Sequence, residues 1–234
     1  MTTLLALTAM AGAVQAANID DYVQTQLHDA TFVARVIKAD QSKLKKINHD
    51  FGTSYRFDST TIKVKEPFMI WGEAKVEDTR ILFVENGAHK MIKGGPFKSK
   101  QNTSNKPGQR QTIFDFGILT PSLFQDLYQA KFVRNDRETG DAVFDVTYID
   151  THDDTSRSRI WVNKAHRIID KREWYNQSGR QLATFFYENP EEIDGVWMPT
   201  KCEVRNVDNV VAGVTAYESI KVNTGIPDSV FSVG

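Results

Sequence analysis

Alternation of apolar and polar residues, rather than helical spacing, dominates this chain and predicts a mainly β protein. Runs that are rich in β-branched and aromatic residues are typical of strands. The predicted strands are residues 31–38, 55–57, 61–65, 68–71, 80–84, 89–93, 142–149, 158–163, 167–175, 181–188, 200–207 and 211–222. Because strands outnumber helices throughout, we expect the helices to cover one sheet face or to plug one opening.

Residues that favour turns separate these runs and predict antiparallel hairpins. Asn86-Gly87 lies between two apolar runs, and this pair is a strong hairpin signal because a type I′ turn needs positive φ at both central residues. Asn189-Pro190 predicts a break in the chain, and residues 40–50 predict a capped, lysine-rich turn. Residues 94–110 are rich in Gly, Pro, Ser, Asn and Lys, so we expect a long surface loop there.

Helical patterns are confined to two short segments. Asp20 or Asp21 is suited to cap a helix that runs to Leu27. Thr120-Pro121 fits an N-cap followed by the first helical position. Four apolar residues of this second segment then fall on one side of the helix, namely Leu123, Phe124, Leu127 and Tyr128. The fold class that follows is mainly β with two or three helices.

The N-terminus has the composition of a secretory signal peptide. Residues 4–14 form a run of apolar and small residues, and Val14-Gln15-Ala16 is an acceptable cleavage site. This run of roughly eleven residues is shorter than the roughly 20 that cross a bilayer as a helix. We therefore expect a signal peptide at residues 1–16 and a single exported domain at residues 17–234, with a buried N-terminal helix as the alternative.

Composition excludes several classes of function. The 234 residues include 29 Lys and Arg against 30 Asp and Glu, a formal charge of −1, so the chain as a whole is not attracted to nucleic acid or to an anionic membrane. Partners must therefore be selected by local features. Cys202 is the only cysteine, which excludes an internal disulfide, a Cys-x-x-Cys metal site and a lipid anchor directly after the signal.

One cluster combines imidazole and carboxylate groups, the loop Asp150-Thr151-His152-Asp153-Asp154. Adjacent residues on a turn usually point apart, so we interpret it as a polar turn rather than a metal site. The sequence contains no nucleophile elbow, no zinc-protease motif, no P-loop and no dinucleotide fingerprint. We expect no enzyme activity, no catalytic or metal-binding residues and no cofactor; a hydrolase that uses His152, Asp153 and Asp154 is an open alternative.

Several stretches in order resemble the periplasmic lipoprotein carriers of the LolA/LolB type. The first two are residues 65–71, Lys-Glu-Pro-Phe-Met-Ile-Trp, and residues 81–87, which end in Glu-Asn-Gly. The others resemble the C-terminal half of LolA-like outer membrane lipoprotein-sorting proteins, and they are residues 159–163, 171–175, 194–200, 220–223 and 227–231. The resemblance implies a half-open antiparallel β-barrel whose apolar concave side is covered by a helical lid.

The resemblance also implies a function. It is that of a monomeric periplasmic carrier that binds acyl chains of a lipoprotein or lipid and takes them toward the outer membrane. Its partners would be an inner-membrane donor and an outer-membrane acceptor. The alternative, from a different class, is a lipid- or lipoprotein-sensing or scaffold module of the same fold without transport activity. Bound lipid without transfer between vesicles would favour the sensing module.

Large apolar residues spread along the chain are the candidate ligand-binding residues. They are Phe68, Trp71, Phe83, Phe114, Phe116, Leu123, Phe124, Phe185 and Phe186. Alternate residues of a strand face opposite sides, so only one of Phe185 and Phe186 is expected to point into the cavity. In the carriers an arginine before the proline is thought to hold the lid closed, and here that position is Glu66. Lys65 or Arg56 is the candidate substitute for this latch.

Overall fold

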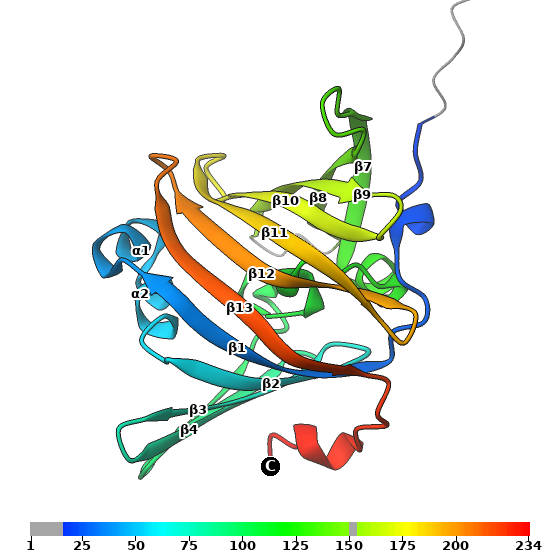
Figure 1. The fold of residues 1–234 in the computed structure, drawn as a ribbon. Coiled ribbons are helices and arrows are strands. Elements are labelled where there is room, and N and C mark those ends of the chain that lie inside the picture. The colour runs from blue at the N-terminus through cyan, green and yellow to red at the C-terminus, as the bar shows by residue number, and fades with distance from the viewer. Residues whose placement is uncertain (1–15, 150–153) are drawn as a thin grey trace, which may run out of the picture.

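The computed structural model of the protein describes residues 16–149 and 154–234. Within these residues the chain forms one antiparallel sheet of 13 strands that curls into an open half-barrel (Figure 1). The strands are β1 Asp29–Ala39, β2 Ser59–Lys65, β3 Met69–Val76, β4 Thr79–Asn86, β5 His89–Gly94, β6 Phe97–Asn102, β7 Tyr128–Asn135, β8 Ala142–Tyr148, β9 Arg157–Asn163, β10 Ile168–Tyr175, β11 Gln181–Ile193, β12 Val196–Asn206 and β13 Val211–Val222. The predicted fold class, mainly β and half-open, is confirmed. The predicted signal peptide lies outside the described residues except for Ala16.

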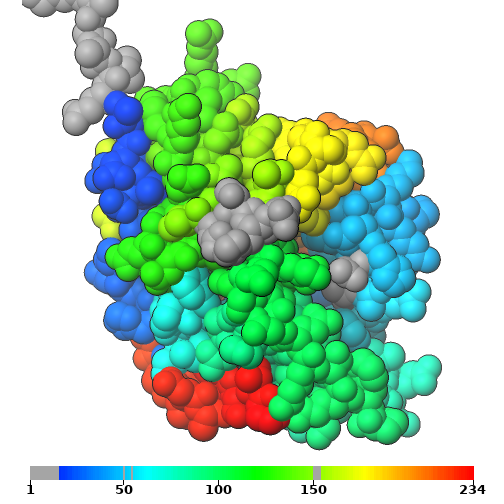
Figure 2. Space-filling model, turned by 180° about the vertical axis from the view of Figure 1, so that it is seen from behind, coloured from blue at the N-terminus to red at the C-terminus, as the bar shows by residue number. Residues whose placement is uncertain are grey.

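The strands follow the chain in two halves that meet in the middle of the sheet. The order is β6-β5-β4-β3-β2-β1-β13-β12-β11-β10-β9-β8-β7, so β1 pairs with β13. The two edge strands, β6 and β7, are therefore consecutive in the sequence. Residues 103–127, which we call the connecting segment, run between these edges along the concave side of the sheet, where Figure 2 shows green atoms across the middle of the face.

Short helices lie at the ends of the half-barrel and within the connecting segment. They are η1 Ile19–Tyr22, α1 Gln41–Ile47, α2 His49–Ser54, η2 Pro107–Gln109, η3 Ile113–Phe116, η4 Leu123–Leu127 and η5 Asp228–Phe231. The prediction of a turn at residues 40–50 is thus wrong, because α1 and the start of α2 lie there; only the predicted cap is present. Asp40 accepts hydrogen bonds from the backbone of Ser42 and Lys43, and Leu44 and Ile47, spaced by one helical turn, bury against the sheet.

The first predicted helix is also shorter than expected. Asn18, not Asp20 or Asp21, caps η1, and this helix ends at Tyr22 instead of running to Leu27. The second predicted helix, at Thr120-Pro121, is present but ends at Leu127, because Tyr128 already begins β7. In both segments tertiary pairing overrides a weak local helical preference.

The strand assignments differ from the prediction at four places. Residues 94–110 are not one long loop, since β6 occupies Phe97–Asn102 and pairs with β5 along its whole length; a polar edge strand needs no apolar face. Residues 55–57 lie after α2 and form no strand, and β7 was not expected at all. Asn189-Pro190 does not break β11, because Asn189 takes a φ of 53° and Pro190 pairs opposite Pro199.

The hairpin predicted at Asn86-Gly87 is confirmed, although its turn is centred one residue later. Asn86 pairs with His89, which leaves Gly87 and Ala88 as the loop, and only Gly87 has a positive φ. This pattern is that of a type II′ turn. The turn with positive φ at both centres lies instead at Asp194-Gly195, between β11 and β12.

The sheet has apolar residues on both of its faces. The main core lies on the concave face and includes residues of the connecting segment, of α1 and of most strands. A second, smaller cluster lies on the outer face of β3, β4 and β5, where Ile226 and Phe231 cover Val84 and Met91. The region around η5 therefore closes the outer face of one flank (Figure 1).

Candidate functional site

The concave face is apolar, and the connecting segment fills most of it. Seven of its apolar side chains are at most 6% exposed and pack into the main core; they are Ile113, Phe114, Phe116, Ile118, Leu119, Leu123 and Leu127. Gly117 allows a close approach to the sheet, because a Cβ atom there would lie 2.6 Å from the ring of Tyr187. The cover of the concave face is thus an irregular segment with short helical turns.

An ion pair between buried Arg172 and partly buried Asp115 fixes the middle of the connecting segment to β10. The Arg172 guanidinium lies 2.7 Å from the Asp115 carboxylate and also donates to Ser158 Oγ at 3.1 Å. Arg172 further lies 4.5 Å from the ring centroid of Phe114. Although burial opposes its charge, Asp115 keeps the pKa of Arg172 above its ordinary value. This part of the segment is held by polar and apolar contacts together.

A buried carboxyl group, Glu85 of β4, faces the same segment. Its Oε1 accepts a hydrogen bond from the backbone N–H of Gln111 at 3.2 Å. Its Oε2 has no hydrogen-bond partner among the described residues. Burial raises the pKa of Glu85 to about 7, although the nearby Lys90 ammonium opposes this rise. A carboxyl group in such a place changes its charge near neutral pH.

Glu66, at the position of the carriers' arginine, also contacts the connecting segment. Its carboxylate accepts a hydrogen bond from Ser122 Oγ, and burial raises its pKa while hydrogen bonds from Ser122 and Thr120 oppose the rise. A polar link between the β2–β3 turn and the cover is therefore present with the opposite charge. Whether this link acts as a latch stays a prediction.

The two candidate substitutes for the latch lie elsewhere. Lys65 Nζ contacts Asp228 Oδ1 at 2.5 Å and the carbonyl oxygen of Ile226 at 2.7 Å, so it holds the C-terminal residues on the outer face. Arg56 is exposed and precedes β2, whereas Glu66 follows it. The seven residues of β2 separate these two positions by roughly 20 Å, so Arg56 does not take the place of the arginine.

The nine predicted ligand-binding residues fall into three groups. Four are buried within the main core, namely Phe114, Phe116, Leu123 and Phe185. Three are partly buried against it, namely Phe68, Phe83 and Phe124. The remaining two do not line the concave face, because alternation along their strands turns them outward. Trp71 packs in the outer cluster, and Phe186 lies 4.9 Å from the Arg205 guanidinium.

Sequence reasoning named Phe83 but missed its neighbours Ile81 and Ile92 on the concave face. Ile81, Phe83 and Ile92 are half-buried neighbours on the inner side of β4 and β5, since Phe83 pairs with Ile92. Beside them the connecting segment is polar, and it meets these strands through Gln109 and Gln111. The alternation in residues 81–85 was the available signal, but it does not say which face is concave.

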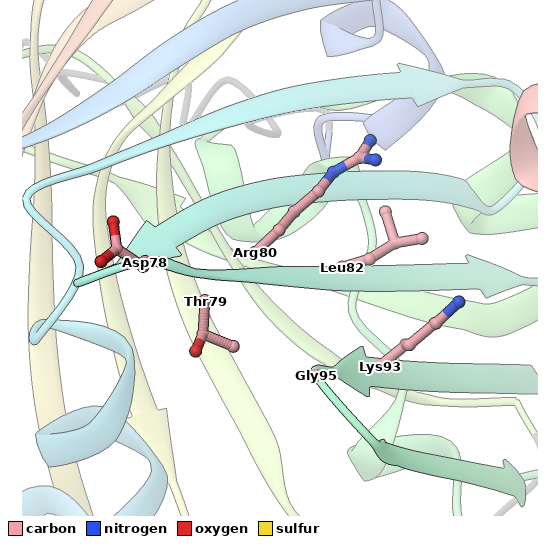
Figure 3. A pocket seen from close by; sticks show the side chains of 6 residues that line it. All are labelled: Asp78, Thr79, Arg80, Leu82, Lys93 and Gly95. Carbon is pink, nitrogen blue, oxygen red and sulfur yellow. The ribbon is translucent and has the colours of Figure 1, made fainter.

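Two pockets of the described residues lie away from this apolar strip. One, of about 330 Å³, is lined by Asp78, Thr79, Arg80, Leu82, Lys93 and Gly95 on the outer side of β4 and β5 (Figure 3). The other, of about 220 Å³, includes Gln24, Lys164 and Trp197 among its lining residues. Neither has the apolar lining that an acyl chain needs.

The loop of residues 150–154 is described only in part. His152 and Asp153 lie outside the described residues, and Asp154 accepts hydrogen bonds from Ser156. Within residues 16–149 and 154–234, no group of three or more His, Cys, Asp and Glu side chains is arranged to hold a metal ion. No helix in the same ranges is long and apolar enough to span a membrane.

Comparisons of the fold point in one direction. The chain is similar to a DUF1329 family protein from Desulfovibrio piger, with 14% identity, a TM-score of 0.60, and coverage of 92% of this chain and 93% of that one. It is also similar to a putative outer membrane lipoprotein-sorting protein domain from Vibrio parahaemolyticus, with 15% identity, a TM-score of 0.60, and coverage of 92% of this chain and 93% of that one. A third similar structure is a LolA superfamily protein from Nitrosomonas europaea, with 19% identity, a TM-score of 0.59, and coverage of 92% of this chain and 94% of that one.

Sequence comparisons are more restricted. Comparison with the curated proteins gave no match. A family model described as "Uncharacterized protein" matches residues 87–234, which is more than half of the chain. This match runs from the β4–β5 turn through the connecting segment to the C-terminal end of the chain. The chain belongs to the family that this model describes, and its fold is LolA-like.

Proposed function

We propose that this protein binds acyl chains of a lipid or lipoprotein on its concave face and carries them through the periplasm toward the outer membrane. One observation carries the proposal. Half-buried Ile81, Phe83 and Ile92 form an apolar strip on the inner side of β4 and β5. The mostly polar residues 103–112 lie beside this strip. The fold shared with lipoprotein-sorting proteins supports the same assignment.

The free-energy cost of exposing each part of the connecting segment decides which part moves. Exposing the seven buried apolar side chains of residues 113–127 would cost roughly 10–20 kcal/mol, at about 1.5–3 kcal/mol each. That cost equals or exceeds the stability of a typical domain. Residues 103–112 bury only Thr103, Pro107 and Thr112, and they meet the strands mainly through hydrogen bonds, such as those of Gln109 and Gln111, worth about 0.5–1.5 kcal/mol each.

The gain from binding exceeds that smaller cost. Burial of about ten methylene groups is worth roughly 8 kcal/mol, at about 0.8 kcal/mol per group. A guest therefore displaces residues 103–112 and leaves residues 113–127 in place as the floor of the site. Half-buried Phe83 then contacts the guest directly, whereas fully buried Phe114 supports the site from within.

Binding of the fluorescent probe dansyl-undecanoic acid tests the proposal. Phe83→Gln should weaken binding roughly 10- to 100-fold, the equivalent of about 1.5–3 kcal/mol of lost apolar contact. Leu82→Gln is the matched control, because Leu82 is the preceding residue and packs on the outer face. Absence of probe binding by the parent protein, or equal losses in the two variants, would refute the proposed site.

A sensing or scaffold module without transport activity is the second candidate. The observation in its favour is the depth to which residues 113–127 fill the concave face, since a fixed floor leaves room for little of a large guest. Transfer of a labelled lipoprotein between donor and acceptor vesicles separates the two functions. Accelerated transfer supports the carrier, and probe binding without transfer supports the sensing module.

A further inference from the structure

The β5–β6 hairpin and the residues that follow it are unusually basic. Between Glu85 and Asp115 the chain has no acidic residue, although its overall formal charge is −1. The same stretch contains six cationic residues, namely Lys90, Lys93, Lys98, Lys100, Lys106 and Arg110. Charge is thus segregated to one free flank of the sheet, where a local field attracts anions in spite of the balanced total.

Three of these lysines share the outer face of the hairpin. Lys93 pairs directly opposite Lys98, and Lys100 pairs opposite Met91, which places all three side chains on one side of β5 and β6. Like charges directly opposite each other destabilise a sheet. Among the described residues no Asp or Glu side chain forms an ion pair with any of the three, whereas the neighbouring cation Arg80 is paired with Glu73. Lys98 Nζ donates a hydrogen bond to the oxygen of Gly234 at 2.8 Å.

Exposed Phe97 lies at the end of the same hairpin. Its side chain is 60% exposed, and it follows Gly95-Pro96 in the turn between the strands. In the sheet register Phe97 lies opposite Gly94, which in turn lies opposite Ile81 of the apolar strip. The hairpin therefore has cations on its outer side and an exposed aromatic ring on its inner side, which is the arrangement of interfacial membrane-binding elements.

Protection of an edge strand does not explain this pattern in full. Lysines on β6, such as Lys98 and Lys100, would prevent strands of other proteins from adding to the edge. Lys93, however, lies on β5, which is paired on both sides. An exposed Phe97 also works against solubility rather than for it. Arg80 and Lys93 line the outer pocket of about 330 Å³ and point to the same side of the sheet (Figure 3).

We propose that this hairpin docks the protein on the surface of an anionic phospholipid bilayer, with Lys93, Lys98 and Lys100 at the phosphate groups and Phe97 inserted among the lipids. The combination of three clustered cations with an apolar tip favours a bilayer over an acidic protein as the partner. The biological role of this docking rests on the proposed function. It would place the strip at Ile81 next to the membrane that donates or receives the guest.

Cosedimentation of the full chain with vesicles tests the proposal. Vesicles of phosphatidylcholine with 30% phosphatidylglycerol are compared with vesicles of phosphatidylcholine alone, at low and at high salt. We expect binding only to the anionic vesicles and its loss at high salt. The triple variant Lys93→Ser, Lys98→Ser, Lys100→Ser should bind on the order of 100-fold more weakly, at about fivefold per lysine.

Matched variants keep the result interpretable. A control triple variant changes three lysines that are exposed elsewhere, Lys38, Lys164 and Lys221, to Ser and should bind as the parent does. Phe97→Ser should weaken binding without changing its dependence on salt. Circular dichroism confirms folding, which the hairpin variants should retain because they relieve repulsion between Lys93 and Lys98.

Each outcome has one meaning. Equal binding to both vesicle types, no binding by the parent, or equal losses in the two triple variants would overturn the docking surface. Dansyl-undecanoic acid binding in vesicle-free solution is measured on the same proteins. Loss of docking with intact probe binding is the expected behaviour of the hairpin variant, and loss of probe binding by Phe83→Gln reports only on the concave site.

Discussion

Glu85 should make the stability of this protein depend on pH, and Glu85→Gln should remove most of that dependence. The side chain is fully buried on the concave face. Burial raises the pKa of its carboxyl group from 4.5 to about 7. One carboxylate oxygen accepts the backbone N–H of Gln111, and the other has no partner within the described residues. The ionised form is therefore poorly accommodated in the folded state.

The sign of the effect follows from the direction of this shift. Between pH 4.5 and about 7 the folded state keeps the proton of Glu85 while the unfolded state has lost it. Stability that is fully present below pH 4.5 is consequently lost as pH rises through the folded-state pKa. The difference between 4.5 and about 7, at about 1.4 kcal/mol per pH unit, amounts to about 3 kcal/mol.

Urea unfolding at several values between pH 5 and pH 8 measures this contribution. The free energy of unfolding of the parent should decrease as pH rises across this range. The free energy of unfolding of Glu85→Gln should decrease less, and the two decreases should differ by up to about 3 kcal/mol at pH 8. Asp170, whose pKa burial also raises, to about 6, contributes its own slope. Asp170→Asn is therefore the control. In this background, Glu85→Gln should reduce the pH dependence of the free energy of unfolding by the same amount as it does in the parent. Identical slopes for the parent and Glu85→Gln would refute the reasoning.

Other contacts predict further outcomes. Gly117→Ala should destabilise the fold by about 2–5 kcal/mol in urea, because φ is +82° there and a Cβ atom would meet the Tyr187 ring; an unchanged midpoint would contradict this. Asp115→Asn should cost about 3–5 kcal/mol, because Arg172 would keep a buried charge without its partner. Phe231→Ala should cost about 3–5 kcal/mol but leave probe affinity unchanged, since this fully buried ring closes the outer face.

Local patterns predicted the strands well and the connections between them poorly. Residues 181–188 and 211–222 have the composition of strands, and β11 and β13 form there. Residues 97–102 did not predict a strand, because an edge strand is specified by backbone pairing with β5 and needs no apolar alternation. Asn189-Pro190 failed as a break because the left-handed φ of Asn189 lets the strand continue.

The candidate site was predicted only in its parts. Phe83 and Phe114 lie on the concave side, whereas Trp71 lies on the outer face, since alternation fixes which residues share a face but not which face is concave. The buried pair of Asp115 and Arg172 joins residues 57 positions apart and has no local signature. Only the topology, in which the two edges of the sheet are consecutive, brings the connecting segment onto that face.

The pairing of β1 with β13 has a consequence for biogenesis. Ala30 lies opposite Val222, so the two halves of the sheet join through residues from nearly opposite ends of the chain. Contacts of such long sequence separation form slowly. Until β13 has been synthesised and released, β1 presents an unpaired edge on which other polypeptides can add as strands. We therefore expect newly made chains to need a holding chaperone until β1 and β13 have paired.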